Sequence, residues 1–513
     1  MDDMKSEKVV RDASPVANED TKKAAPILRD VGADLYLEIQ DYTSEELEAE
    51  RKIVLRKIDW VIMPLICVTY MIQFLNKLSL NYASAYGLIA DLGLQGQRYS
   101  WVAAIFNFGY LGAAIPANLL LQRVPVGKFT GGCLVVWSIL LCCHAAVHNY
   151  AGMLVIRFML GVCEAGISPA IMSICAMFYT RQEQPLRMCT FLAFNGMATM
   201  VGALLGFGLG HVNSKAITSW ELIFVVIGLM NFVWSFVFLA FMPDSPANAR
   251  FLTHKQKVVA VHRIAANMTG VKSSAFNAAQ AVEACLDFKV WCLTLIGLAM
   301  GIINGGVSNF LSALIKGFGF SGINATLLQL PTGALEFLLV PLLGMAAGFW
   351  RNTRCLFLAV ACLPGLGGLL GIRFTNLDHR WSLVGSCWLQ FIFGGAVILC
   401  WNLMTTNIAG HTKRSVTNGL WFAFYAAGNI IGPNIFFARE APRYQSAITG
   451  LVVCMIGSVV LAGVLAAHMA WENRRRDRAM AADETVAHGI EEAILEGFQD
   501  RTDKESKGFR YCL

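Results

Sequence analysis

The sequence predicts an all-α membrane protein in which twelve transmembrane helices form two six-helix bundles, the second a pseudo-repeat of the first. Three observations lead to this class. Residues of the set AVILMFWYC make up 56% of the 513 residues, charged residues make up only 15%, and the mean hydropathy is +0.53. A soluble globular chain carries about 25% charged residues. Twelve apolar runs are long enough for the roughly 20-residue helix that crosses a bilayer, and one polar stretch divides them six and six.

The predicted helices follow the apolar runs in order. A β-barrel is disfavoured because barrel strands alternate between apolar and polar residues, whereas these runs are continuously apolar. The runs lie near residues 60–83, 99–121, 128–148, 150–176, 188–211, 220–242, 290–315, 326–349, 355–373, 382–405, 416–437 and 447–470. Similar segments in the fifth and eleventh runs, FNGMATMVGALLG and FYAAGNIIGPNIF, support a repeat. We therefore predict a tail, a bundle, a linker, a second bundle and a second tail at 1–57, 58–242, 243–289, 290–470 and 471–513.

Lysine and arginine concentrate in alternate loops, which is the distribution that marks the cytoplasmic loops of membrane proteins. The loops after the second, fourth, sixth, eighth and tenth helices hold them, and the tail after the last helix reads NRRRDR. We therefore expect both termini in the cytoplasm. The first 57 residues contain no signal peptide, so the first helix would direct insertion. The plasma membrane is the expected location, with the vacuolar membrane as the alternative.

The composition excludes several classes of function. The net charge of +6 comes from 41 basic and 35 acidic residues without a basic tail, so we expect no nucleic-acid partner. The 15 cysteines lie mostly in apolar runs, where they act as small buried hydrophobes, and they lack metal-binding spacing. We expect no metal, no cofactor and no enzymatic activity, because the sequence shows no nucleophile elbow or phosphate-binding loop in a suitable context. The expected state is a monomer in the lipid bilayer.

Several motifs between residues 51 and 478 resemble those of one transporter family. They are LRKIDWVIMPL, DLGLQGQRYSWVAAIFNFGYL, RFMLGVCEAGISPA, MPDSP, NIAGHTKRSVTNG, GNIIGPNIF and WENRRRDR. Together they are similar to the major facilitator superfamily and, more narrowly, to the fungal allantoate permeases, a family of anion:cation symporters. The resemblance implies the twelve-helix major facilitator fold, alternating access, and proton-coupled uptake of small solutes that usually bear a carboxylate, such as ureides, vitamins and small peptides.

Two segments depart from the pattern of that superfamily. The loop after the second helix, NLLLQRVPVGK, lacks the usual acid, so we expect backbone and helix-end contacts at the cytoplasmic gate. The basic residues expected near this gate are Arg123, Lys128, Arg187, Lys413 and Arg414. The first helix carries Asn76 before Lys77, where many relatives have an acid, and this removes a first-helix acid as the proton carrier.

Charged residues inside the predicted spans are candidate functional residues, because a charge at the bilayer centre costs roughly 3 kcal/mol or more. Lys77 and Arg157 lie at similar depths toward the outer side, and we expect them to bind a substrate carboxylate. The alternative for Lys77 is that its amine reaches the outer interface. The alternative for Arg157 is that it anchors neighbouring helices by hydrogen bonds.

Two carboxyl groups are candidates for proton coupling. Glu164 follows Arg157 by seven residues, which places both on one helix face, and it lies near the midplane. Its alternative is a structural pair with the first or fifth helix. Glu336 lies between Pro331 and Pro341 in the eighth helix and is the second candidate. Its alternative is a hydrogen bond to a neighbouring helix.

The resemblance also implies which helices surround the substrate, namely the first, fourth, seventh and tenth. It places Asn304, Asn309 and Asn402 as polar contacts, with Trp401 and, in the eleventh helix, Tyr425 as aromatic contacts. The alternative for the amides is helix–helix hydrogen bonding, which contributes only about 0.6 kcal/mol on average. The aromatic residues would then serve in packing or at the membrane interface.

Three functions remain open at this point. The first is a secondary transporter that takes up a small organic anion, with the proton as coupling ion. The second is an exporter of a fungal secondary metabolite; the fifth helix lacks the proline common in such antiporters, which favours uptake. The third is a nutrient sensor that has the transporter fold and little transport. The direction of net flux separates the first two.

Overall fold

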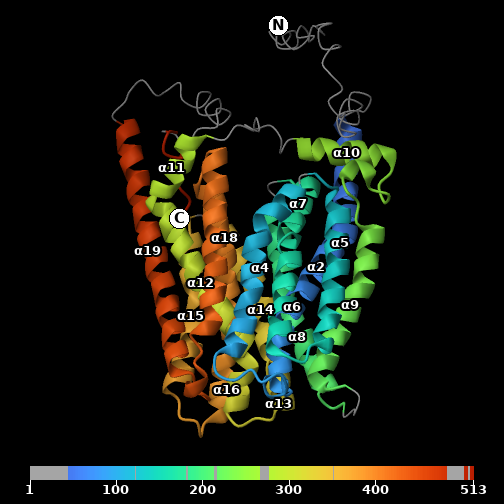
Figure 1. Cartoon of the computed structure of the whole chain (residues 1–513). Coiled ribbons are helices and arrows are strands. Elements are labelled where there is room, and N and C mark those ends of the chain that lie inside the picture. Colours follow the sequence, from blue (N-terminus) through green and yellow to red (C-terminus); the bar gives the residue numbers. More distant parts are fainter. Residues whose placement is uncertain are drawn as a thin grey trace, which may run out of the picture.

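The computed structural model describes residues 44–121, 123–180, 183–212, 217–265, 277–350, 352–481, 502–506 and 509–513, and the described residues are mostly helical (Figure 1). The longer helices of the first half are α2 (Ser44–Ala85), α4 (Arg98–Leu121), α5 (Val126–Cys143), α6 (Tyr150–Glu164), α7 (Ile167–Phe178), α8 (Gln184–Leu209) and α9 (Ser219–Phe241). The linker holds α10 (His254–Ala265) and α11 (Ala278–Leu286). The second half has α12 (Phe288–Gly317), α13 (Gly322–Leu327), α14 (Leu330–Phe349), α15 (Arg354–Phe374), α16 (Arg380–Trp388), α17 (Gly394–Asn407), α18 (His411–Asn434) and α19 (Gln445–Ala481). Short elements are α3 (Leu88–Asp91), η3 (His144–Ala146), η4 (Pro246–Asn248), η5 (Gln390–Phe393) and η6 (Ala438–Glu440).

Within the described residues, eleven helical stretches are long and apolar enough to cross a membrane. The remaining predicted span is α18, whose polar start, HTKRS, lowers its apolar content. Helix α18 packs closely along α12: a Cβ on Gly428 would lie 2.3 Å from the carbonyl oxygen of Leu298, and one on Gly432 would lie 2.4 Å from that of Ile302. The predicted all-α membrane fold is confirmed.

Several helices begin or end away from the predicted limits because amphipathic segments extend them. Helix α2 begins at Ser44, inside the stretch expected as a tail, and the buried side chains of Val54 and Ile58 explain this extension. Lys57 on the same segment donates a 2.9 Å hydrogen bond to Gln256 of α10. Helix α19 likewise continues to Ala481. Length and hydropathy locate the membrane spans but not these polar extensions.

Three of the spans are interrupted, and each interruption has a local cause. The fourth span divides into α6 and α7 around Ala165 and Gly166, because Pro169 lacks the N–H that would bond to the carbonyl of Ala165. The eighth span divides into α13 and α14 just before Pro331. The tenth divides into α16, η5 and α17 before a pair of glycines at 394–395. Glu164 at the first break and Gly394 at the third lie beside a cavity between the two halves.

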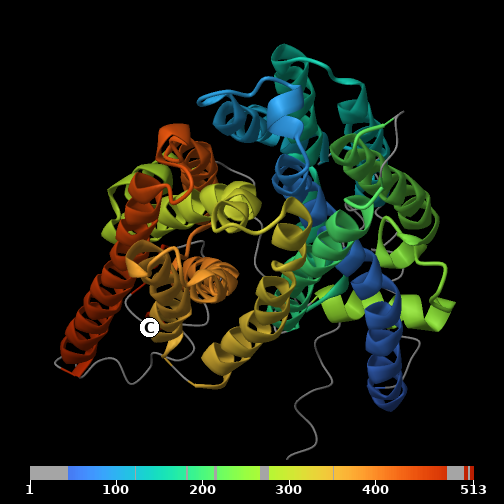
Figure 2. The ribbon, with the colours of Figure 1, turned by 90° about the horizontal axis from the view of Figure 1, so that it is seen from below.

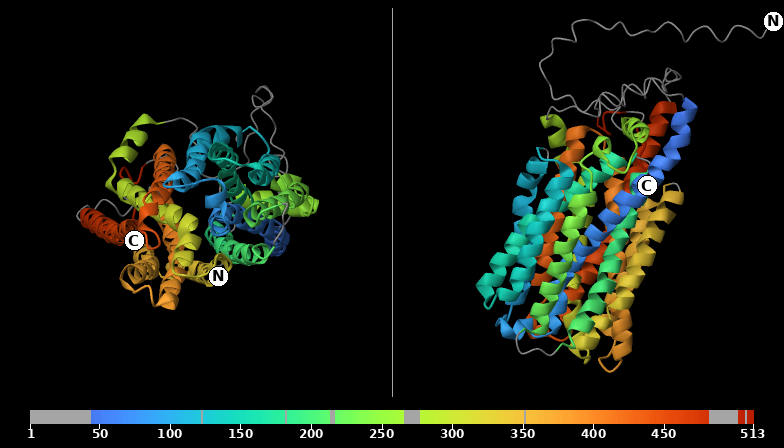
Figure 3. Two further views of the ribbon diagram at one scale, coloured as in Figure 1. Left: turned by 60° about the horizontal axis from the view of Figure 1, so that its bottom comes forward. Right: turned by 90° about the vertical axis from the view of Figure 1, so that its right-hand side faces the viewer.

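The helices form two groups that face each other, coloured blue to green and yellow to red (Figure 2). We call the end of the molecule where α10 and α11 lie the linker end, and the end where α13 and α16 lie the far end (Figure 1). The long α2 runs obliquely from the linker end to the far end (Figure 3). The start of α2 and the end of α19 both lie at the linker end (Figure 1).

Toward the far end the two halves are joined by buried hydrogen bonds. Asn81 accepts from the backbone of Ser312 at 2.8 Å and donates to Gln329 at 3.0 Å. The hydroxyl of Tyr99 donates to the backbone oxygen of Asn309 at 2.8 Å. Asn81 and Gln329 are completely buried. The structure is therefore closed between the halves at the far end.

Candidate functional site

A cavity of about 190 Å³ lies between the halves, on the linker side of the closed far end. Helices α2, α4, α7 and α8 of the first half and α12, α14, α17 and α18 of the second half contribute to its lining. Pockets for drug-sized ligands have volumes of about 300–1,000 Å³. The cavity therefore suits a small solute. Its polar and charged lining residues are Gln73, Lys77, Asn107, Glu164, Ser168, Asn195, Asn304, Glu336 and Asn429.

Lys77 points into the cavity and links the two halves. Its Nζ donates to Oδ1 of Asn304 on α12 and, at 3.1 Å, to Oδ1 of Asn429 on α18. Both partners are neutral amides. Among the described residues Lys77 forms no ion pair, so its positive charge is not neutralised by a carboxylate within hydrogen-bonding distance. The position of its amine excludes the alternative that it reaches the membrane surface.

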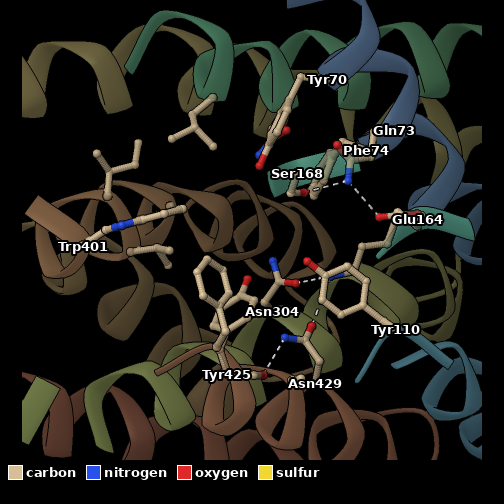
Figure 4. Close-up of a pocket in the computed structure, with 18 of the residues that line it drawn as sticks. Tyr70, Gln73, Phe74, Tyr110, Glu164, Ser168, Asn304, Trp401, Tyr425 and Asn429 are labelled. Atoms are coloured by element: carbon tan, nitrogen blue, oxygen red, sulfur yellow. Dashed lines mark hydrogen bonds between the residues drawn. The ribbon is translucent and has the colours of Figure 1, made fainter. Parts of the chain in front are cut away.

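Glu164 is the last residue of α6, at the break in the fourth span. Its Oε1 accepts a 3.0 Å hydrogen bond from Nε2 of Gln73, which also donates to the hydroxyl of Ser168 at 3.2 Å (Figure 4). Gln73 is four residues before Lys77 on α2, so one helix face presents both the amide and the amine. The carboxyl group is buried yet lines the cavity. This arrangement places a proton-binding group and a cation in the same cavity.

Glu336 lies in the cavity on the opposite half. It is 4% exposed, and its Oε2 has no hydrogen-bond partner among the described residues. Its Oε1 lies near Gly394 of α17, where an added Cβ would be 3.5 Å away. The cavity therefore contains one carboxyl group from each half, Glu164 and Glu336.

Aromatic rings form one wall of the cavity near its linker side. The rings of Trp401 and Trp421 lie 6.0 Å apart, and Phe422 packs edge-on against Trp401 at 5.1 Å. Tyr425 stacks on Trp421 at 5.2 Å with an interplanar angle of 9°. Two of these residues, Trp401 and Tyr425, were predicted from the sequence. A flat wall of this kind suits a planar group.

Three of the residues predicted to bind substrate lie elsewhere. Arg157 is 3% exposed within the first half, with its guanidinium 5.7 Å from the ring of Phe224, and it is not part of the cavity lining. Asn309 lies at the closed far end, where its side chain donates to the carbonyl of Gly305 at 2.7 Å. Asn402 follows Trp401 on α17 and is turned away by the 100° step of the helix.

Two of the predicted gate residues, Arg187 and Arg414, have partners within their own halves, whereas Lys413 also contacts the linker helix α11 and Asp503. Arg187 pairs with Asp59 at 2.9 Å, while Arg123 and Lys128 are exposed. Arg414 donates to the carbonyl of Ile408 at 3.1 Å. Lys413 is fully buried, and its amine contacts Glu283, Asp287 and Asp503 at 2.7–2.8 Å. These three carboxylates lie close enough together to bind a metal ion, but they already pair with the ammonium groups of Lys413 and Lys289.

Sequence reasoning missed several lining residues. Gln73 could have been found, because it is one helical turn from Lys77. Asn107 and Tyr110 share a face of α4 three residues apart, yet neither differs from an ordinary polar packing residue in the sequence. Asn195 of α8 likewise gave no signal. The cavity can only be assembled once the packing of the two halves is known.

Comparison with known proteins identifies the family. A family model described as Major Facilitator Superfamily matches residues 66–433. The chain belongs to this superfamily. An uncharacterized transporter of Schizosaccharomyces pombe is 37% identical over 92% of this chain and 89% of its own length. The allantoate permease of Saccharomyces cerevisiae is 32% identical over 89% of this chain and 86% of its own length.

Solved structures support the same fold. A bacterial homologue of the human lysosomal transporter Spinster, in an inward-facing and unoccupied conformation, aligns with a TM-score of 0.55 at 15% identity, covering 82% of this chain and 96% of that chain. As a member of the Major Facilitator Superfamily, the protein is a multi-pass membrane transporter of small molecules. This agrees with the class predicted from the sequence.

Proposed function

We propose that this protein is a proton-coupled importer of a small organic anion, in which Lys77 binds the substrate carboxylate and Glu164 carries the proton. The observation that supports this most directly is the setting of Lys77. Its amine faces the neutral amides of Asn304 and Asn429, so a substrate carboxylate can replace them as the acceptor. A hydrogen bond between charged groups is stronger than one to a neutral amide.

The remaining lining suits a ureide or a similarly polar carboxylate. Allantoate, which names one relative, combines a carboxylate with two urea groups. The amides of Gln73, Asn107 and Asn195 offer both donors and acceptors to such groups. The Trp401 and Tyr425 rings offer a surface for a flat urea or ring. A carboxylate vitamin or a small peptide fits the same chemistry.

The proposed cycle couples the proton to the anion by charge. With the cavity open to the outside, Glu164 takes up a proton and the substrate carboxylate binds Lys77. The halves then rock, and the cavity opens to the cytoplasm. Release of the proton restores a negative charge on Glu164, which repels the substrate carboxylate in the same cavity. Glu336 is the second candidate for a proton in this cycle.

The test is uptake of labelled allantoate into proteoliposomes that hold the purified protein, with pH 5.5 outside and pH 7.5 inside. Parallel assays contain unlabelled nicotinate, biotin, pantothenate or a dipeptide as competitors. We expect accumulation that a protonophore abolishes. Accumulation that persists with the protonophore would refute proton coupling. Efflux down a gradient of the same solutes, without accumulation, would instead indicate export.

Two substitutions test the assigned roles. Lys77→Met should raise the KM roughly 10- to 150-fold, the loss expected for a hydrogen bond to a charged group worth about 1.5–3 kcal/mol. Lys52→Gln, an exposed lysine of the same helix, is the matched control and should leave the KM unchanged. Glu164→Gln should abolish accumulation driven by the pH gradient while exchange of substrate continues. Retained accumulation in that variant would mean that a group other than Glu164 carries the proton. Glu336→Gln would then be the next variant to test.

A further inference from the structure

Residues 502–506 and 509–513 fold back onto the linker end of the second half. Tyr511 is 3% exposed, and Asp503 is completely buried. The backbone of Cys512 and the side chain of Asn407 on α17 exchange two hydrogen bonds, at 2.7 and 2.9 Å. The backbone oxygen of Leu513 accepts from the backbone of Arg354, at the start of α15, at 2.7 Å. The segment thus contacts helices that are far apart in the sequence.

The centre of this contact is a buried group of charges. Asp503 accepts from Lys413 of α18 at 2.7 Å and also from the amine of Lys289 on α12. Asp287 lies on the other side of Lys413, at 2.7 Å. Burial by itself would raise the pKa of Asp503, but the two ammonium groups hold the pKa of its carboxyl below the ordinary value. An acid of the folded-back segment therefore joins the ammonium groups of two helices of the bundle, α12 and α18.

Arg476 of α19 binds the backbone of the same segment. Its guanidinium donates to the carbonyl oxygens of Asp503 and Phe509, both at 2.9 Å, and to that of Ser506 at 3.3 Å. Asn473, one turn earlier on α19, exchanges two hydrogen bonds with the backbone of Tyr511, at 2.8 and 2.9 Å. The Tyr511 hydroxyl in turn donates to Asp503 at 2.8 Å. These contacts fix both the path of the chain and the position of its buried acid.

The linker helix α11 shares this charge group. Glu283 of α11 accepts from Lys413 at 2.8 Å. Gln280 of α11 accepts from the backbone amides of Thr412 and Lys413 at the start of α18, at 3.1 and 3.3 Å. Lys413 is therefore held by three elements at once: the linker helix, the bundle and the folded-back segment. Movement of any one of them must disturb its contacts.

We propose that the folded-back segment, residues 502–506 and 509–513, is an internal ligand of the second half, and that its docking through Asp503 locks the linker helix α11 to the start of α18. With the segment in place, α11 and the second half move as one unit during transport. With the segment released, α11 and the start of α18 gain freedom at the linker end. The linker end thereby carries a latch that is separate from the substrate cavity, and the proposal does not depend on which solute is carried.

Hydrogen–deuterium exchange of the full-length protein in lipid nanodiscs, read by mass spectrometry, tests the latch. In the unsubstituted protein the amides of residues 502–506 and 509–513 should exchange slowly. Asp503→Asn keeps the shape but loses the charge, and it should speed exchange about tenfold or more in these residues, in α11 and at the start of α18. Arg474→Gln, at an exposed residue of α19 two positions before Arg476, is the control and should leave all three segments unchanged.

Further comparisons separate loss of the latch from general unfolding. Helix α4 of the first half should exchange at the same rate in every variant. Tyr511→Phe removes only the hydroxyl that donates to Asp503, so it should loosen the same three segments to a smaller degree. Fast exchange of residues 502–506 and 509–513 in the unsubstituted protein would overturn docking. Faster exchange of these residues in Asp503→Asn without any change in α11 would overturn the lock on the linker helix.

Discussion

The contact between Gly196 and Gly333 is where α8 of the first half and α14 of the second approach most closely, and Gly196→Ala tests it. A Cβ on Gly196 would lie 2.4 Å from the carbonyl oxygen of Gly333 and 2.5 Å from the backbone nitrogen of Phe337. Ordinary contacts begin at 3.4 Å, so the helices must separate by about 1.0 Å. The obstacles are backbone atoms, which no side-chain rotation can remove.

Overpacking of this kind costs typically about 1–3 kcal/mol. Each kcal/mol moves the thermal midpoint of a large domain by about 2 °C, so we expect a fall of about 2–6 °C for Gly196→Ala. The assay is thermal unfolding of the purified protein in detergent, followed by tryptophan fluorescence. Gly208→Ala is the matched control, because a Cβ at this position of the same helix meets nothing within 4 Å.

The reciprocal substitution, Gly333→Ala, tests whether the two glycines contact each other. A Cβ on Gly333 would lie 2.5 Å from the carbonyl oxygen of Gly196, so the separation required by one alanine accommodates much of the other. The double variant should therefore lose less stability than the sum of the two single variants. Additive losses, or a Gly196→Ala midpoint equal to that of Gly208→Ala, would show that α8 and α14 do not meet at these glycines.

Two further predictions concern the far end and the latch. Asn81→Ala leaves the buried backbone amide of Ser312 and Oε1 of Gln329 without their partner, which costs about 1–3 kcal/mol. A thiol-reactive probe should therefore label a cysteine introduced at Ser312 faster in the Asn81→Ala background than in its absence. Equal labelling would argue against this seal. The depressed pKa of Asp503 means that its stabilisation is present above its ordinary pKa of 3.8 and is lost as the pH falls through the lower folded value. The difference in thermal midpoint between the unsubstituted protein and Asp503→Asn should therefore stay constant from pH 7 to pH 5 and shrink below about pH 3.8, whereas a decline between pH 7 and pH 5 would contradict the sign of this shift.

The membrane spans could be predicted from the sequence because the length of an apolar run is a local property of the chain. The polar start of α18 shows the limit, since its packing along α12 through Gly428 and Gly432 compensates for its lower apolar content. The polar start of α2 was missed for a related reason: its buried residues Val54 and Ile58, spaced one turn apart, lie among polar and charged residues. A hydropathy value averaged over a window of residues does not detect so few apolar positions.

Of the residues chosen because a charge is costly in a membrane, Lys77, Glu164 and Glu336 line the cavity. The same argument chose Arg157, but it could not tell a cavity from the interior of one half, where Phe224 covers the guanidinium. Asn309 was chosen for its amide, yet its backbone oxygen is the group that meets Tyr99. Asp503 contacts Lys289 and Lys413, which are more than 80 positions away in the sequence. No local sequence pattern predicts such contacts.

The hydrogen bonds at the far end are made by Asn81, Gln329, Ser312 and Tyr99, whose side chains neither gain nor lose a proton below about pH 10. Acidification of the surrounding medium therefore leaves these bonds intact. On the proposed cycle, the carboxyl groups of the cavity respond to acidity, while the hydrogen bonds that close the far end do not. Acidification would thus strengthen the driving force for uptake without weakening the contact between the two halves.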